Sequence, residues 1–255
     1  MRILVTNDDG IEAPGLAALC EIASKLSSDV WVVAPEVNHS GAGHSLSLRD
    51  PVRLRKIAER RYAVKGTPTD CVIMAVRRVM FDHRPDLILS GVNQGQNLAE
   101  DVTYSGTIAA AFEGTLVDIR SIALSQSVGF REGRTPQWQT ARHFAPELIT
   151  QLLSIDWPAG VLMNVNFPDC LPEEVKGVRV TRQGRRDQST LAIEERRDSW
   201  GDAYYWLGFG RTLSNPPKDV DLWAIYNGFV SVTPLSMNLT ADNMHGPLTT
   251  ALRSS

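Results

Sequence analysis

Residues 1–10 read MRILVTNDDG, a short apolar run that ends in a polar turn. The run at residues 2–6 is rich in aliphatic and β-branched side chains, which predicts a buried strand. After the turn, Pro14 suits the first position of a helix, and apolar residues recur at helical spacing as far as Leu26. A buried strand followed closely by a helix is the first half of a βαβ unit, from which parallel sheets are built.

The same alternation of strand and helix patterns continues to about residue 170. Further strands are predicted at residues 30–34, 86–89, 119–124 and 160–165, and further helices at residues 67–80, 108–117 and 136–153. The first of these further helices opens on Thr67-Pro68-Thr69-Asp70, which resembles a capping box. We therefore predict an α/β fold in which a mostly parallel sheet carries helices on both faces.

Three regions depart from this alternation. Residues 49–64 alternate apolar with basic side chains, which is typical of a more exposed β ribbon. Residues 176–211 are rich in Gly, Arg and aromatic side chains, which indicates a β-rich extension. A short helix at residues 221–226 and a strand at residues 229–233 are then expected before a loose tail.

Length and composition favour one folded unit. The 255 residues are 43% hydrophobic and 22% charged, which is the ordinary range of globular proteins. We interpret residues 1–255 as a single domain, with an α/β core over residues 1–170 and a β-rich C-terminal extension over residues 176–234.

The charge balance argues against polyanionic partners. The chain contains 26 basic and 29 acidic residues, so it has no strongly basic electrostatic field. Neither a nucleic-acid polymer nor a membrane surface is therefore an expected partner. No apolar stretch reaches the roughly 18 residues of a membrane helix, and no signal-peptide pattern is found, so a cytoplasmic location is expected. The three cysteines, Cys20, Cys71 and Cys170, lie far apart and are expected to be reduced.

Two adjacent carboxylates follow the first predicted strand. Asp8 and Asp9 would repel each other at a strand end unless a cation lay beside them, and hard divalent ions prefer oxygen ligands. The alternative is an Asx-turn that Asp9 and Gly10 close without any ligand. Ligands of open α/β sheets bind at the carboxyl ends of the strands, and this position favours the metal site.

Other polar loops follow neighbouring strands and are expected at the same sheet edge. Ser40 lies in a Ser- and Gly-rich loop, and Asn93 carries an amide oxygen that can complete the shell of a hard metal ion. Ser105-Gly106-Thr107 opens an apolar helix whose free N–H groups can cradle a phosphate. Local turn hydrogen bonds and helix capping are the alternative interpretations of these residues.

Several familiar catalytic motifs are absent from the sequence. There is no GxxxxGK[ST] loop, no complete GxGxxG fingerprint after the first strand, no GxSxG elbow and no HExxH helix. P-loop NTPases, Rossmann dehydrogenases, serine hydrolases of the α/β type and zincins are therefore disfavoured. Among the histidines, His44 is the best candidate for a substrate contact because of its loop position.

Six segments together resemble one known family. In chain order they are VTNDDG, APEVNHSGAGHSLSL, KGTPTDCV, DLILSGVNQGQN, TYSGTIAAAFEG and VSVTPL, and they resemble the survival protein E (SurE) family over nearly the whole chain. The resemblance implies a Rossmann-like α/β core and a homodimer or homotetramer in which the C-terminal region reaches a neighbouring subunit. It also implies a divalent-metal-dependent 5′-nucleotidase that acts on nucleoside 5′- or 3′-monophosphates, with short polyphosphate as a further substrate of some members.

The resemblance also implies site residues. The metal ligands of the family fall on Asp8, Asp9, Ser40 and Asn93, and its phosphate contacts fall on Asn97, Ser105, Gly106 and Thr107. One Mg²⁺ or Mn²⁺ per subunit is the implied cofactor, and nucleoside monophosphates are the implied substrates. Asp8 and Asp9 are the expected catalytic residues, either by orienting a water molecule or by direct attack of Asp8 on phosphorus.

Two other functions use a similar site. A metal-dependent glycosyl or nucleotidyl transferase also places an acidic pair and a metal ion against a diphosphate. A non-enzymatic nucleotide-sensing module would bind the same ligands without turnover. The Arg-rich run at residues 182–197 is expected to be a solvated face, and the alternative is that Arg185 and Arg186 steer phosphorylated substrates toward the site.

Overall fold

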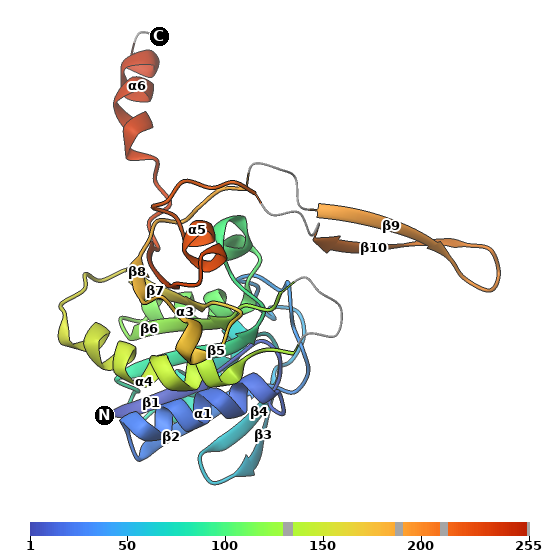
Figure 1. The fold of residues 1–255 in the computed structure, drawn as a ribbon. Helices are drawn as coiled ribbons and strands as arrows, with labels where there is room; N and C mark the ends of the chain where they lie inside the picture. Colours follow the sequence, from blue (N-terminus) through green and yellow to red (C-terminus); the bar gives the residue numbers. More distant parts are fainter. Residues whose placement is uncertain (130–134, 187–190, 210–213, 254–255) are drawn as a thin grey trace.

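The computed structural model describes residues 1–129, 135–186, 191–209 and 214–253 (Figure 1). Over these residues a nine-stranded sheet occupies the centre of the molecule, in the order β3-β4-β2-β1-β5-β6-β7-β11-β8. Its strands are β1 (Arg2–Thr6), β2 (Asp29–Pro35), β3 (Arg53–Ala58), β4 (Arg61–Lys65), β5 (Leu87–Gln94), β6 (Arg120–Gln126), β7 (Val161–Phe167), β8 (Val178–Val180) and β11 (Val230–Ser236). Neighbouring strands are parallel except in the β3–β4 and β7–β11 pairs, which confirms the predicted mostly parallel sheet.

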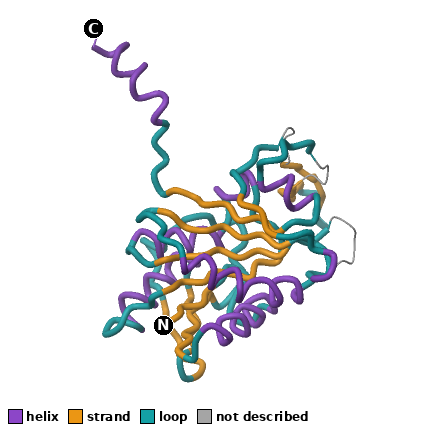
Figure 2. Tube along the Cα trace, turned by 60° about the vertical axis from the view of Figure 1, so that its left-hand side comes forward, coloured by secondary structure: helices purple, strands orange, loops and turns teal. Residues whose placement is uncertain are grey.

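Helices cover both faces of this sheet, as predicted (Figure 2). On one face lie α1 (Pro14–Leu26) and α4 (Trp138–Ser154), and on the other lie α2 (Pro68–Met74) and α3 (Gly106–Leu116). Side chains of β1 alternate between the two layers, because Ile3 and Val5 pack in the core under α1 while Leu4 packs in the core under α2. A strand that is buried on both faces reads as a continuous apolar run.

The capping box predicted before the second helix is present. Thr67 Oγ1 accepts a hydrogen bond from the backbone nitrogen of Asp70 at 3.1 Å, and Asp70 Oδ2 accepts one from that of Thr67 at 2.8 Å. The helix predicted through Met80 continues beyond α2 as a π-helical turn at Ala75–Val79. The ribbon expected over residues 49–64 corresponds to the antiparallel β3–β4 pair at one edge of the sheet.

The C-terminal part of the chain is divided between the body and two projections. β8 and β11 join the main sheet, and α5 (Asp221–Tyr226) packs beside them, whereas the hairpin of β9 (Leu191–Arg197) and β10 (Ala203–Phe209) extends away from the body (Figure 1). The expectation of a loose tail is wrong, because α6 (Asp242–Arg253) is a helix, one that buries none of its residues. The described part of the chain contains no helix that is both long and apolar enough to span a membrane.

Candidate active site

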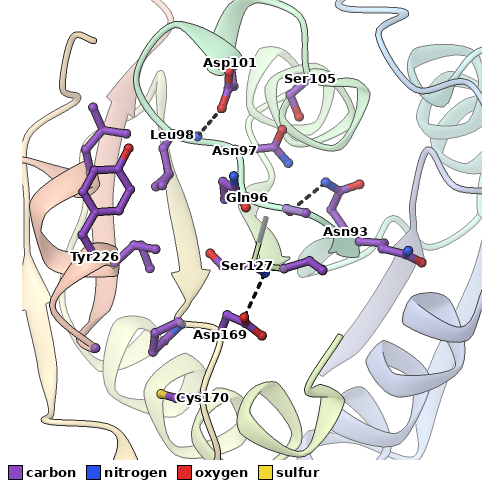
Figure 3. Close-up of a pocket in the computed structure, with 18 of the residues that line it drawn as sticks. Asn93, Gln96, Asn97, Leu98, Asp101, Ser105, Ser127, Asp169, Cys170 and Tyr226 are labelled. Carbon is purple, nitrogen blue, oxygen red and sulfur yellow. Dashed lines mark hydrogen bonds between the residues drawn. The ribbon is translucent and has the colours of Figure 1, made fainter. Parts of the chain in front are cut away.

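Loops at the carboxyl ends of the parallel strands enclose a cavity with a volume of about 820 Å³. Five of the residues expected at a site line it, namely Asp8, Ser40, Asn93, Asn97 and Ser105. They come from the ends of β1, β2 and β5 and from the start of α3, so the sheet brings together residues that are widely separated in sequence. Figure 3 shows the cavity, with Asn97 and Ser105 beside each other and Tyr226 contributed by α5.

Asp8 is an almost completely buried carboxylate at this edge of the sheet. Only 4% of the residue is exposed, and Oδ1 accepts a hydrogen bond from Thr107 Oγ1 at 2.5 Å. Burial raises the pKa of Asp8 to about 6, the Thr107 hydroxyl partly offsets this rise, and the neighbouring Asp9 charge adds to it. A negative charge on Asp8 is therefore costly here, and a bound cation would relieve that cost.

Asp9 lies closer to the surface and joins two loops. Its Oδ2 accepts a hydrogen bond from the backbone nitrogen of Gln94 at 3.1 Å, and its Oδ1 accepts one from Asn38 Nδ2 at 3.3 Å. Partial burial raises its pKa above the ordinary value, and the Gln94 bond lowers it in part. The adjacent carboxylates are therefore anchored in different ways, Asp8 by α3 and Asp9 by β5 and the loop after β2.

Ser40 and Asn93 provide neutral oxygen atoms at the same cavity. The loop of Ser40 is shaped by a hydrogen bond from its backbone nitrogen to Asn38 Oδ1 at 2.7 Å, and Asn93 Nδ2 donates to the carbonyl of Gly95 at 2.9 Å. With its amide nitrogen held in this way, the oxygen of Asn93 is the atom that could ligate a cation. No group of three or more His, Cys, Asp and Glu side chains suited to a metal ion occurs in the described ranges, so any cation here would depend on these neutral ligands. Carboxylate, hydroxyl and amide oxygens are the donors that Mg²⁺ and Mn²⁺ prefer, so the residues fit such an ion.

The first turn of α3 faces Asp8. Ser105 caps the helix, because its Oγ accepts a hydrogen bond from the backbone nitrogen of Ile108 at 3.1 Å. A Cβ atom on Gly106 would lie 2.7 Å from the Cβ of Asp8, so glycine allows the helix and the carboxylate to approach closely. Thr107 is directed at Asp8 and does not line the cavity, which places Gly106 and Thr107 behind the carboxylate. The positive end of the helix dipole thus lies at the acidic end of the cavity.

Arg186 is not part of a solvated face, although the Arg-rich run at residues 182–197 favoured one. Its guanidinium lies 2.7 Å from Asp101 Oδ2 and 3.2 Å from Glu100 Oε2, and only 13% of its side chain is exposed. Burial raises the pKa of Asp101, and Arg186 partly offsets that rise. Arg186 is therefore a paired residue in the cavity wall, whereas Arg185 is exposed.

His44 does not line the cavity, in contrast to the contact expected from its loop position. Its Nε2 lies 3.1 Å from Glu113 Oε2, and its ring stacks on Phe112. Cys71 is buried, whereas Cys20 and Cys170 are partly exposed, and all three are unpaired. Of the three, Cys170 reaches the cavity wall beside Asp169 (Figure 3).

Sequence reasoning missed two groups of residues at this site. One is the buried pair Asn164 and Asn166 in β7, which hold the backbone of Asn97, and the other is Asp221, which holds the backbone of Ala99. The available signal was the segment NVNFP at residues 164–168. Asparagines at alternate positions of a strand that is buried on both faces need hydrogen-bond partners, which marks them as candidates for holding a neighbouring segment.

Comparison with known proteins agrees with this architecture. The sequence model of the family described as survival protein SurE matches residues 3–190. The chain is 58% identical to 5′-nucleotidase SurE of Parvibaculum lavamentivorans over 252 residues, which cover 99% of this chain and 91% of that protein. It is 59% identical to 5′-nucleotidase SurE of Azorhizobium caulinodans over 244 residues, which cover 96% of each.

A solved structure is similar to nearly the whole chain. The crystal structure of SurE protein from Aquifex aeolicus superposes with a TM-score of 0.85 at 38% sequence identity, covering 99% of this chain and 100% of that one. Family match, sequence identity and fold agree with the resemblance drawn from the six sequence segments. The chain belongs to the SurE family.

Proposed function

We propose that this protein is a divalent-metal-dependent phosphatase that releases phosphate from nucleoside 5′-monophosphates. The observation that carries the proposal is the position of the Asp8 carboxylate. It accepts a hydrogen bond from Thr107 at the start of α3, and it lines a cavity together with Ser40 and Asn93. Relatives 58% and 59% identical to the chain are named 5′-nucleotidases. The proposal extends to nucleoside 3′-monophosphates and short polyphosphate, because a cation held at the acidic end of the cavity would bind the phosphoryl group that all of them share.

The proposed cofactor is one Mg²⁺ or Mn²⁺ per subunit, held by Asp8, Asp9, Ser40 and Asn93. When bound, such an ion supplies positive charge for the phosphoryl oxygens and favours ionisation of a water molecule near the reacting phosphorus. The carboxylates of Asp8 and Asp9 keep the ligand set anionic, and Thr107 fixes the direction of Asp8. Neutral Ser40 and Asn93 complete the set without adding charge to a partly buried region.

The remaining residues hold the substrate. Asn97 and Ser105, the N-cap residue of α3, line the same cavity, and the amide of Asn97 supplies an N–H donor for phosphoryl oxygens. Leu222, Ile225 and Tyr226 add apolar and aromatic surface to the lining, which suits a nucleoside. A carboxylate of Asp8 or Asp9 orients the attacking water. Borohydride reduction of enzyme quenched during turnover tests this step, because conversion of Asp8 to homoserine would reveal an aspartyl phosphate and show that Asp8 attacks phosphorus instead.

The deciding experiment is phosphate release from a panel of nucleoside 5′- and 3′-monophosphates and tripolyphosphate with Mg²⁺, Mn²⁺ or EDTA. We expect metal-dependent release that Asp8→Asn and Asp9→Asn abolish. Asp156→Asn is the matched control, because Asp156 is fully exposed and does not line the cavity. Binding of nucleotide without turnover would indicate a sensing module, and release only in the presence of an acceptor would indicate a transferase.

We further propose that the protein is a homodimer or homotetramer that acts in the cytoplasm. The β9–β10 hairpin and α6 project from the body and expose large apolar side chains, among them Trp200, Leu207 and Leu252. Apolar surface on projecting elements favours contact with further copies of the chain. Light scattering coupled to size-exclusion chromatography measures the assembly, and a monomer at micromolar concentration would contradict it. Cell fractionation tests the location, and competition with single-stranded DNA tests the expected indifference to nucleic-acid polymers.

A further inference from the structure

We propose that Asn166, together with Asn164 and Ser125, positions Asn97 for phosphate binding. This inference rests on the proposed function, because it assigns a role to residues that support a phosphate contact. Asn164, Asn166 and Ser125 do not line the cavity and would touch neither metal nor substrate. They are positioning residues that act through Asn97.

Asn166 pairs its side-chain amide with the backbone of Asn97 in both directions. Its Oδ1 accepts a hydrogen bond from the Asn97 backbone nitrogen at 2.9 Å, and its Nδ2 donates to the Asn97 carbonyl at 3.1 Å. Asn164 Nδ2 donates to the same carbonyl at 2.9 Å. Both polar groups of the Asn97 backbone are therefore held by β7, and the Cα–Cβ bond of Asn97 has one direction.

The side chain of Asn97 is held as well. Its Nδ2 donates to Ser125 Oγ at 2.8 Å. A primary amide nitrogen carries two N–H bonds, so this contact uses one and leaves the other for a ligand oxygen. Free rotation of the amide would instead present its oxygen to the phosphate in part of the population. The Ser125 contact therefore favours the orientation in which a donor is available for an anionic ligand.

The three supporting residues form a buried row along the sheet. Ser125 in β6 lies directly opposite Asn166 in β7, and on its other side it lies opposite Asn93 in β5. Ser125, Asn164 and Asn166 are all completely buried. Polar side chains in such a position are costly unless they are hydrogen-bonded, and here their partners are Asn97 or one another. The hydrogen bonds of these residues thus fix the position of Asn97 relative to the sheet.

The test compares two variants with two matched controls. Asn166→Ala removes both contacts with the Asn97 backbone, and Ser231→Ala alters a fully buried residue opposite Asn166 in β11 that hydrogen-bonds to Thr181. Ser125→Ala removes the contact with the Asn97 amide. Its control is Ser121→Ala, which changes the same residue type in the same strand at equal burial.

The readouts are KM for a nucleoside monophosphate, the inhibition constant of inorganic phosphate, and Mn²⁺ affinity by calorimetry. We expect Asn166→Ala and Ser125→Ala to raise KM and the phosphate inhibition constant about tenfold, the effect of losing one oriented hydrogen bond to a charged ligand. Mn²⁺ affinity should stay within about twofold, because the hydrogen bonds that the two substitutions remove end on Asn97 and Asn164 and on no proposed metal ligand. The controls should leave all three quantities within about twofold, because Ser231 hydrogen-bonds to Thr181 and Ser121 to Ile119, and neither bond involves Asn97.

The outcomes separate this inference from the proposed function. Unchanged KM and phosphate inhibition in both variants, with an active unsubstituted protein, would overturn the inference and leave the function standing. A parallel loss of Mn²⁺ affinity would also overturn it, because a general structural role would then explain the data. If the unsubstituted protein neither releases nor binds phosphate, both fail. Should Asn166→Ala not fold by circular dichroism, Ser125→Ala decides alone.

Discussion

The carboxylate of Asp221 accepts a hydrogen bond from the backbone nitrogen of Ala99 at 2.9 Å, although 122 residues separate the two. Ala99 has a φ of 52°, a left-handed conformation that is unusual for a residue other than glycine. Its carbonyl accepts a second bond, from Gln183 Nε2 at 2.9 Å. The loop between Asn97 and Ser105 is therefore held by hydrogen bonds from the C-terminal half of the chain. Asp221 of α5 and Gln183, which precedes the hairpin, supply these bonds.

Replacing Asp221 with alanine should destabilise the protein strongly. The carboxylate also accepts hydrogen bonds from the backbone nitrogens of Gly184 at 2.9 Å and Leu222 at 2.7 Å, so the substitution leaves several buried donors without a partner. We expect the free energy of unfolding to fall by about 3 kcal/mol. Urea unfolding measures this. Asp219→Ala is the control, because Asp219 is exposed in the same segment and its loss should cost less than about 0.5 kcal/mol.

The pH dependence of stability should contain a contribution from Asp221. Burial raises the pKa of this carboxyl above its ordinary value of 3.8, so the folded state binds its proton more tightly than the unfolded state. The group therefore favours folding most at low pH, and this contribution is lost as pH rises through the raised pKa. In urea unfolding from about pH 4 to 7, the stability of the wild-type protein relative to Asp221→Asn should fall as pH rises. A difference independent of pH would contradict the assignment.

Gly106→Ala should damage the candidate site more than the fold. The added Cβ would meet the Cβ of Asp8 at 2.7 Å and its Oδ2 at 3.0 Å, so the carboxylate has to move. We expect metal-dependent phosphate release to fall by about two orders of magnitude, because misplacing a reacting group by about 1 Å has effects of this size. Gly246→Ala is the matched control, since this glycine lies in α6 with no atom within 4 Å of the added carbon. It should retain activity.

Thr107→Val should lower activity while retaining the shape of the side chain. The substitution removes the hydroxyl that donates to Asp8 Oδ1 and leaves the carboxylate free to rotate. We expect kcat/KM to fall about tenfold, the cost of one charge-assisted hydrogen bond. Thr107→Ser keeps the hydroxyl and should restore most of the activity. Equal rates for the valine and serine variants would show that the contact does not matter for the reaction.

Arg186→Ala should destabilise the protein, whereas Arg185→Ala should not. Arg186 is paired with Glu100 and Asp101 in the cavity wall, and its removal leaves the partly buried Asp101 carboxylate without its cation. We expect a loss of about 1–3 kcal/mol for Arg186→Ala and less than about 0.5 kcal/mol for the exposed Arg185. Because the charge of Arg186 is neutralised locally, the double substitution Arg186→Ala and Asp101→Asn, which keeps the net charge, should leave the salt dependence of kcat/KM unchanged. A flatter salt dependence would instead support electrostatic steering by this residue.

Local sequence patterns predicted the fold and the acidic end of the cavity. The apolar run of β1 predicts a strand buried on both faces, because side-chain alternation is a property of a few consecutive residues. Polar residues directly after such strands fall at one edge of a parallel sheet, which is why Asp8, Ser40 and Asn93 could be grouped from sequence. The loose tail was predicted wrongly, because α6 contains Gly246 and Pro247, which locally disfavour a helix.

The support of the cavity was decided by tertiary structure. Asn166 reaches the backbone of Asn97, and Asp221 reaches that of Ala99, only because β7 and α5 fold beside a loop that lies far away in sequence. The Arg-rich run likewise predicts a solvated face, but Arg186 is partly buried and paired with two carboxylates of that loop. Periodicity and turn chemistry act between near neighbours in the chain, so they determine the elements and the residues at their ends. Hydrogen bonds between distant segments depend on how those elements pack, and only the folded chain specifies them.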